Sequence, residues 1–326
     1  MKNSNTATLI GKKDRITRLK KLGSYFKRNY LLYLMIIPAL VVIIVFKYYP
    51  MSGIQLAFKD WNPWAGIWGS DWAVNEMGET DIFIHFKTLM ADSLFWTKFG
   101  NTLRISVMKI IFGFPIPILI SLFLNEMRWR LYKNIVQTIS YLPHFISWVI
   151  ISGILLTMTQ ADSPFQFFLE KLFGKQIFFF SNNDSFLGMV VISNIWKSCG
   201  WGTIIYLAAL QGIPIENYEA AEVDGAGRWQ KMWYITLPGI LPAICMRLIF
   251  TVSGITSAGF DQIFNMYNST VYEKGDVLET YLYRNGIIGG RYDISQAMGL
   301  FNSLIGLTLT ITANKIVNKM GGEGIW

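Results

Sequence analysis

The sequence contains few of the residues that usually carry catalysis or cross-links. There are two cysteines and two histidines among 326 residues. Cys199 and Cys245 both lie in apolar segments, so we expect them to be packing residues and not parts of a disulfide framework or a metal site. His85 and His144 do not form an H-E-x-x-H zinc-protease pair, and no G-x-S-x-G nucleophile elbow is present. Catalysis by this chain is therefore not indicated.

A phosphate-binding loop is also missing. The two Gly-Lys pairs, Gly11-Lys12 and Gly174-Lys175, are followed by Lys and Gln, whereas a G-x-x-x-x-G-K-[ST] loop requires Ser or Thr at that position. We therefore expect this chain to bind no ATP and no cofactor of its own.

Charged residues are scarce as well. They make up 15% of the chain, whereas soluble domains contain about 25%. The net charge of +8 could suggest nucleic acid. However, the basic residues stand at the ends of apolar runs and not on an interleaved basic and aromatic surface, so membrane topology explains them better.

What the chain has in abundance is long apolar segments, and hydrophobic residues make up 52% of it. A helix needs about 20 residues to cross about 30 Å of hydrocarbon. The first apolar segment follows a basic tail and has no small-residue cleavage pattern, so it is expected to be a retained anchor. The sequence predicts an all-α polytopic membrane protein with six transmembrane helices: Tyr30–Phe46, Asn101–Leu124, Ile135–Met158, Phe186–Leu210, Pro238–Phe260 and Gln296–Val317.

The orientation follows from the basic residues, which accumulate in cytoplasmic loops. With the N-terminus inside, the predicted cytoplasmic segments carry roughly twice as many Lys and Arg as the longer outside segments. Both termini are therefore expected in the cytoplasm. The predicted organisation is a basic tail (1–29), the first span (30–46), an extracytoplasmic segment (47–100), a core of five spans with a cytoplasmic loop at 211–238 (101–317), and a C-terminal tail (318–326).

Two outside segments have patterns of their own. The run "KDWNPWAGIWGSDW" contains tryptophans that could stack on sugar faces, but anchoring at the membrane interface is the favoured interpretation. Charged residues interrupt the apolar segment from Ser163 to Phe180, so an interfacial amphipathic helix fits it better than a seventh span.

The cytoplasmic loop contains the stretch "EAAEVDGAGRWQKMWYITLP" from Glu219 to Pro238. Pro214 suits the first turn of a helix, and Asp224-Gly225 is a strong turn signal that should end this helix. A second short helix is expected from Arg228 to about Tyr234. Thr236 is the expected cap of the next span, with Pro238 in its first turn. Two interpretations stay open from these residues alone: a bent helical lever between two spans, or a solvated connector.

The same loop matches the signature E-A-A-x(3)-G-x(9)-I-x-L-P of the membrane-spanning subunits of binding-protein-dependent ABC importers. All seven fixed positions agree: Glu219, Ala220, Ala221, Gly225, Ile235, Leu237 and Pro238. The chain resembles most closely the sugar-permease branch, which imports oligosaccharides and polysaccharide fragments. The segments "NTLRIS", "QTISYLPHFISW", "IWKSCGWGTIIYLAALQGI", "DVLETYLYRNGI" and "AMGLFNS" are also similar to that branch, so the resemblance extends from about residue 30 to the C-terminus.

The resemblance implies a type I ABC importer permease in a bacterial cytoplasmic membrane. In that family two permease subunits, here expected to be a heterodimer with a homologous chain, form the pathway for a carbohydrate. A dimer of ATP-binding subunits holds ATP and Mg²⁺, and an extracytoplasmic solute-binding protein delivers the solute. The loop would couple ATP binding to opening of the pathway. Carried over, Glu219, Ala220, Ala221, Asp224 and Gly225 form the docking helix and its turn, and Arg228, Ile235, Leu237 and Pro238 complete the coupling loop.

The solute pathway is less clear from the sequence. Lys197 lies near the middle of the fourth span, so it must be paired or must face water. Its partners are either sugar hydroxyls or a structural group, and the structural pairing is favoured. The other candidates supply aromatic faces and hydrogen-bonding groups that suit a neutral sugar: His144, Trp148, Asn194, Trp196 and Trp201. Arg104, Lys109 and Arg247 are expected to be satisfied near helix ends or cavities and are not assigned to the solute.

Two other classes of function are weighed against the importer subunit. A secondary transporter usually carries intramembrane carboxylates for ion coupling. No Asp or Glu lies well inside any of the six spans, which counts against this class. A membrane scaffold or sensor would need neither a pathway nor an ATPase partner, and failure to copurify with an ATP-binding subunit would favour it.

Overall fold

The computed structural model describes residues 25, 28–319, 321–322 and 324–325. Most of the predicted N-terminal tail and part of the C-terminal tail lie outside these residues. The described part is helical, and its β-structure is limited to two isolated bridges, Lys59 with Trp72 and Val74 with Thr80. The all-α prediction is confirmed for this part of the chain.

The chain divides into two compact units, which are described separately. The first comprises residues 1–56 and 62–70, and the second comprises 57–61 and 71–326. In the first unit, α2 (Tyr30–Ile43) continues through a π-helical turn, η1 (Ile44–Tyr48), into the 3₁₀ segment η2 (Tyr49–Phe58). None of the α2 side chains is buried within the chain. A helix that is apolar on every face is suited to lipid. This unit also contains the short helix α3 (Gly66–Gly69).

The six predicted spans all coincide with helical segments, and three of these segments qualify as spans on their own. They are Tyr30–Phe58, Ser93–Glu126 and Tyr292–Lys319, which are long and apolar enough to cross a membrane. Three further helix pairs pass the same test when each bent pair is taken as one span. The described chain therefore has three to six spans by length and composition. The count of six and the cytoplasmic termini stay predictions.

In the second unit, α4 (Ile84–Ala91) is followed by α5 (Ser93–Gly113) and α6 (Pro115–Glu126). The side chain of Asp92 caps α5 by accepting a hydrogen bond from the Leu94 amide at 2.9 Å. Pro115 is in the first turn of α6, where its missing N–H costs no intrahelical hydrogen bond.

The third predicted span, Ile135–Met158, is not a straight helix. It is divided between α7 (Arg130–Tyr141), the 3₁₀ turn η3 (Leu142–Phe145) and α8 (Trp148–Met158), with a bend of 98°. Pro143 has no amide hydrogen to donate, and Ile146 and Ser147 are extended, so the helical hydrogen bonds stop here. Ser147 then caps α8 by accepting from the Ile150 amide.

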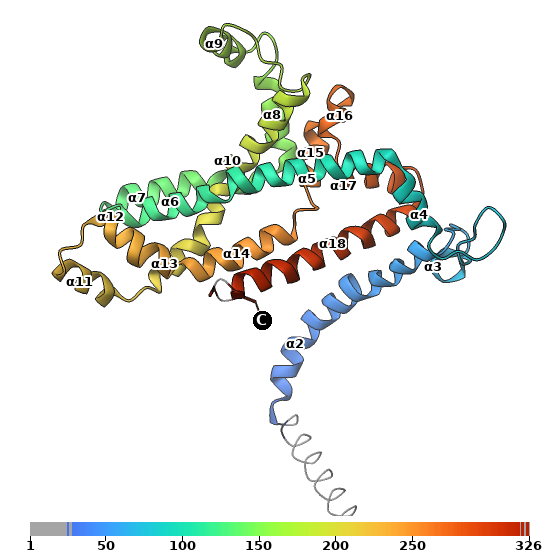
Figure 1. The fold of residues 1–326 in the computed structure, drawn as a ribbon, viewed down its shortest axis with the longest axis horizontal. Helices are drawn as coiled ribbons and strands as arrows, with labels where there is room; N and C mark the ends of the chain where they lie inside the picture. Colours follow the sequence, from blue (N-terminus) through green and yellow to red (C-terminus); the bar gives the residue numbers. More distant parts are fainter. Residues whose placement is uncertain (1–24, 26–27, 320, 323, 326) are drawn as a thin grey trace, which may run out of the picture. The chain divides into compact units, whose positions relative to one another are not determined.

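The next helix, α9 (Pro164–Phe173), confirms the helix predicted after Ser163 and ends at Gly174, which has a φ of +70°. It is followed by α10 (Asn183–Gln211). With 29 residues, α10 is about 44 Å long. It packs against α5, α6, α7, α14 and α15, so it is the central helix of this unit (Figure 1).

The helices that follow α10 begin with α11 (Ile215–Val223), α12 (Arg228–Lys231), the π-helical η4 (Met232–Thr236), α13 (Leu237–Gly239) and α14 (Leu241–Ser253). The fifth span was predicted to reach Phe260, but α14 ends at Ser253. The chain then turns through residues 254–259, where Gly259 has a φ of +94°, and α15 begins at Phe260.

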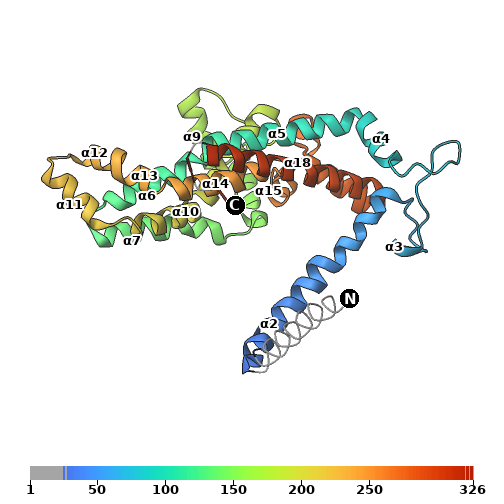
Figure 2. The same cartoon turned by 60° about the horizontal axis from the view of Figure 1, so that its bottom comes forward.

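The last part of the chain contains α15 (Phe260–Met266), η5 (Ser269–Val271), α16 (Tyr272–Gly275), α17 (Leu278–Leu282), η6 (Tyr283–Ile288) and α18 (Tyr292–Lys319). α18 packs along α14 and against α4. Within this unit, α11 and α4 lie at opposite ends in both views (Figures 1 and 2). The predicted cytoplasmic loop is therefore far from the predicted outer end.

A buried ionic cluster fixes the end of this unit that contains α17. The Asp276 carboxylate, 1% exposed, accepts two hydrogen bonds from Arg284 at 2.9 and 2.6 Å and lies 3.1 Å from the ammonium of Lys98 on α5. Burial works to raise the pKa of Asp276. The hydrogen bonds from Arg284 and Thr280 and the charges of Arg284 and Lys98 outweigh it and hold the pKa below its ordinary value.

Candidate functional site

The loop that carries the signature with seven fixed positions begins with a helix, α11, that has a defined C-terminal cap. α11 starts after Pro214, which precedes the first turn, and it ends at Asp224 as predicted. Gly225 has a φ of +78°, which favours glycine. The Ala226 amide donates to the Ala221 carbonyl at 2.8 Å, and the Gly225 amide donates to the Glu222 carbonyl at 3.1 Å. This pair of hydrogen bonds is a Schellman motif, which fixes the direction in which the chain leaves the helix.

The second helix of the loop begins at Arg228, as predicted, but continues further than expected. It runs from Arg228 to Gly239 and meets α14 at a bend of 55°. Thr236 was predicted to cap the following span, and this is wrong: its backbone is helical and its side chain caps nothing. Its hydroxyl instead donates to the Lys231 carbonyl at 3.3 Å and lies 3.0 Å from the Tyr218 hydroxyl.

These contacts join the two arms of the loop. Tyr218 on α11 pairs with Thr236 on η4, and the Lys231 ammonium donates to the Glu222 carboxylate at 3.0 Å. At the base of the loop, a Cβ atom on Gly239 would lie 2.5 Å from Ile213 Cδ1, so a larger residue would require the Ile213 side chain to move. The loop is therefore a helical hairpin whose two arms are joined by side-chain hydrogen bonds and approach closely at its base.

A groove of about 900 Å³ lies between the hairpin and the adjoining ends of α10 and α14. Five of the predicted coupling residues line it: Ala220, Ala221, Asp224, Ile235 and Pro238. Glu219, Gly225, Arg228 and Leu237 lie outside its lining. Large apolar side chains of the same hairpin are exposed: Ile215, Val223, Trp229, Trp233 and Tyr234. Exposed apolar groups gathered on one polar loop are typical of a protein-binding surface.

Four of the six predicted pathway residues meet at the bend of the third span. The Lys197 ammonium, on α10, donates to the carbonyls of Pro143 at 3.3 Å, of His144 at 2.9 Å and of Ile146, and it lies 5.5 Å from the centre of the Trp148 ring. The rings of His144 and Trp201 are stacked, with centroids 4.4 Å apart. Lys197 therefore has structural partners, and it satisfies carbonyls that the bend removes from the helix.

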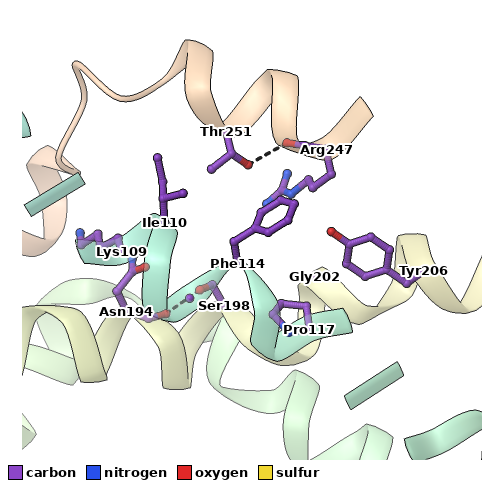
Figure 3. Close-up of a pocket in the computed structure, with 11 residues that line it drawn as sticks. Lys109, Ile110, Phe114, Pro117, Asn194, Ser198, Gly202, Tyr206, Arg247 and Thr251 are labelled. Carbon is purple, nitrogen blue, oxygen red and sulfur yellow. Dashed lines mark hydrogen bonds between the residues drawn. The ribbon is translucent and has the colours of Figure 1, made fainter. Parts of the chain in front are cut away.

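The other two predicted pathway residues lie elsewhere. Trp196 is half exposed on α10, and Asn194 lines a separate cavity of about 150 Å³. This cavity is formed by α5, α6, α10 and α14, and Figure 3 shows its lining. The lining residues are Lys109, Ile110, Gly113, Phe114, Pro117, Asn194, Ser198, Gly202, Tyr206, Arg247 and Thr251.

Two basic residues of this cavity were not assigned to the solute by sequence reasoning. Lys109 donates at 2.6 Å to both the Ala258 carbonyl and Gln262 Oε1, as expected for a satisfied cation beside a cavity. The Arg247 guanidinium makes no hydrogen bond or ion pair with any other described residue. The signal that could have identified Arg247 is its position in the middle of an apolar segment, in a set of spans that contains no acidic residue.

Comparison with known proteins gives consistent matches over most of the chain. Residues 113–318 match the family model described as the binding-protein-dependent transport system inner membrane component. Protein LplB of Bacillus subtilis strain 168 is 40% identical over 301 residues, covering 92% of each chain. The polygalacturonan/rhamnogalacturonan transport system permease protein YteP of the same organism is 38% identical, covering 98% of this chain and 96% of that protein.

A solved structure has the same fold. It is a bacterial ABC transporter involved in the import of the acidic polysaccharide alginate, and one of its chains matches with a TM-score of 0.81 and 38% identity over 92% of this chain and 99% of that chain. A bacterial alginate ABC transporter in complex with an alginate pentasaccharide-bound periplasmic protein also has a matching chain, with a TM-score of 0.82 and 38% identity over 94% of this chain. The chain therefore belongs to the family of inner-membrane components of binding-protein-dependent transport systems.

Proposed function

We propose that this chain is one of two permease subunits of an ATP-driven importer of carbohydrate. Its relatives support the substrate class, because their names include transport of polygalacturonan or rhamnogalacturonan and of arabinooligosaccharides. The matched solved transporter is involved in the import of alginate, an acidic polysaccharide. Polygalacturonan is also acidic because it is built of galacturonate, whereas arabinooligosaccharides are neutral. The names alone do not choose between these two kinds of solute.

The observation that carries the proposal is the hairpin of α11 and α12–η4, whose two arms are joined by side-chain hydrogen bonds. In the proposed assembly, α11 and its Schellman turn dock on an ATP-binding subunit, which holds ATP and Mg²⁺. The exposed apolar side chains of the hairpin supply contact area, and the exposed carboxylate of Glu219 supplies a charge that sets the register. ATP hydrolysis then takes place in that partner and not in this chain.

The hairpin is well placed to transmit a displacement. It is joined to α10 through residues 212–214 and continues directly into α14, and both helices line the polar cavity. Because Tyr218–Thr236 and Lys231–Glu222 link its two arms, a push on α11 reaches both helices together. Closure of the ATP-binding dimer would thereby shift the pathway between inward-open and outward-open states, and a loaded solute-binding protein would favour one of these states.

Substitution at the turn of the hairpin tests the proposal. Gly225→Asp places a side chain at a left-handed position, which costs about 1–2 kcal/mol in an L-residue, and adds a charge beside Asp224. Glu219→Lys reverses the charge on the exposed face of α11. In the complete importer, reconstituted in liposomes, we expect each variant to lower ATP-driven uptake at least about tenfold, which is about 1.4 kcal/mol of coupling, while ATP hydrolysis continues.

The matched control is Gly174→Asp. Gly174 also ends a helix, has a φ of +70° and has open space around it, but it follows α9 and lies outside the hairpin. Its variant should transport like the wild type. Normal uptake and normal ATP hydrolysis in both hairpin variants would contradict the coupling role.

A further inference from the structure

The membrane-spanning segments carry charge of one sign only. The six apolar segments contain no Asp or Glu, but they contain Lys315, two residues before the end of the last segment, and four cations further inside: Arg104, Lys109, Lys197 and Arg247. A cation at this depth must be paired, must bind backbone carbonyls or must face water or a ligand. The partners of each cation therefore show which of them is available to a solute.

Two of these cations are occupied by the protein itself. Lys197 donates to three carbonyls at the bend of the third span. Lys109 uses two of its three N–H groups on Ala258 and Gln262, and its charge also interacts with that of Glu279, so one N–H group is left at the cavity wall. Arg104 is exposed on α5 and does not line the cavity.

Arg247 differs from these residues. It lies in the middle of α14 and lines the cavity, and its guanidinium has no hydrogen-bonded or ionic partner among the described residues. The nearby hydroxyl of Thr251 donates to the backbone carbonyl of Arg247 at 2.8 Å and so leaves the guanidinium free (Figure 3). All five guanidinium N–H groups are therefore available to a solute.

The remaining lining of the cavity suits an acidic sugar. Phe114 supplies an aromatic face, and Asn194 and Tyr206 supply hydrogen-bonding groups from α10. No carboxylate is present among the lining residues to compete for Arg247. A guanidinium can donate two parallel hydrogen bonds to a carboxylate, which neither a neutral hydroxyl nor a lysine ammonium matches in geometry.

We infer that the solute is an acidic oligosaccharide of the uronic acid type, and that Arg247 binds its carboxylates as they pass through the cavity. Lys109 adds positive potential from the facing wall on α5. This inference rests on the proposed function and specifies its substrate class. It replaces the neutral sugar expected from the aromatic residues alone.

Uptake by the complete importer tests this inference. The complex is reconstituted in liposomes that contain ATP, with its solute-binding protein outside. The probes are trisaccharides of galacturonate, glucuronate and mannuronate, each as the free acid and as the uncharged methyl ester, with maltotriose and arabinotriose as neutral sugars. We expect ATP-driven uptake of at least one free acid, at a rate at least tenfold above that of its methyl ester.

Arg247→Gln then separates the pathway from the binding protein. It should lower the maximal rate of acid uptake by about tenfold, or about 1.4 kcal/mol. The KM should stay unchanged, because the unaltered binding protein sets capture. Arg247→Lys keeps the charge without the bidentate geometry and should recover part of the rate. Lys315→Gln, which removes an equal charge from an exposed position on α18 outside the cavity, should behave as wild type.

The possible results distinguish the two proposals. ATP-driven uptake of the neutral trisaccharides in place of the acids would overturn this inference and leave the proposed function intact. Acid uptake that Arg247→Gln leaves unchanged would overturn it as well. If ATP drives uptake of none of the probes, the acidic substrate is overturned. If ATP also drives uptake of no other solute that the binding protein delivers, the proposed function is overturned too.

Discussion

At the scale of single residues, charges of this membrane protein fall into two groups: those paired by the protein itself and those, such as Arg247, with no hydrogen-bonded or ionic partner among the described residues. Asp276 is in the first group, because its buried carboxylate is shared by Arg284 and Lys98. Removing one partner from such a cluster leaves uncompensated charges in a site that water does not reach. The cluster should therefore contribute more to stability than any exposed ion pair.

Asp276→Asn tests this difference. Because it strands two cations, we expect a loss of about 3–5 kcal/mol of folding stability. Asp184→Asn is the matched control, since Asp184 is 79% exposed in its pair with Lys274 and exposed pairs are worth about 0–1 kcal/mol. Thermal unfolding in detergent measures both variants, and equal melting temperatures for the two would contradict the assigned role.

The pH dependence of the same cluster has a definite sign. The pKa of Asp276 is lower in the folded protein than the ordinary value of 3.8. Its contribution is therefore complete above the unfolded pKa, which is about 3.9, and is lost as the pH falls through the folded value. The melting temperature of the wild type should approach that of Asp276→Asn only below about pH 4. Convergence near neutral pH would contradict this assignment.

At the scale of elements, the bend in the third span and the helix α10 form one structural device. Lys197 binds the carbonyls that the bend releases, and Gly200, one turn further along α10, allows α7 to approach. A Cβ atom on Gly200 would lie 1.9 Å from the Ser140 carbonyl oxygen, so a side chain there would have to separate the two backbones.

Gly200→Ala is therefore expected to destabilise the protein, although alanine is the better helix former by about 1 kcal/mol. Gly188→Ala lies in the same helix with open space around it and should be neutral or stabilising. Melting temperatures of the two variants measure the effect. A Gly200→Ala protein as stable as Gly188→Ala would show that the close contact between α7 and α10 is absent.

At the scale of the whole molecule, the sequence predicted what depends on local pattern. Hydropathy located the six apolar segments, and the Asp224-Gly225 pair located the end of α11, because glycine tolerates the left-handed turn there. The 98° bend was missed although Pro143 was visible. Proline is tolerated inside membrane helices, and the break is held by contacts with Lys197 and Trp201, which are distant in sequence.

Long-range packing also explains the errors at the candidate site. Threonine is a residue type that often caps helices, but the hydroxyl of Thr236 contacts the Tyr218 hydroxyl and the Lys231 carbonyl inside a continuous helix. Arg247 and Lys109 lie far apart in the sequence, and they share a cavity only because α14 and α5 both adjoin it. Four of the predicted pathway residues cluster around the bend because aromatic and basic side chains serve packing as well as recognition.

The central claim is that this chain couples a carbohydrate pathway to ATP hydrolysis in a partner through the hairpin of α11. The most direct measurement is the rate of ATP hydrolysis by the reconstituted complex, with and without loaded solute-binding protein, recorded together with solute uptake. We expect loaded binding protein to raise both rates in the wild type, and Gly225→Asp to retain hydrolysis while uptake is lost. Uptake that proceeds without ATP, or that Gly225→Asp leaves coupled to hydrolysis, would contradict this claim.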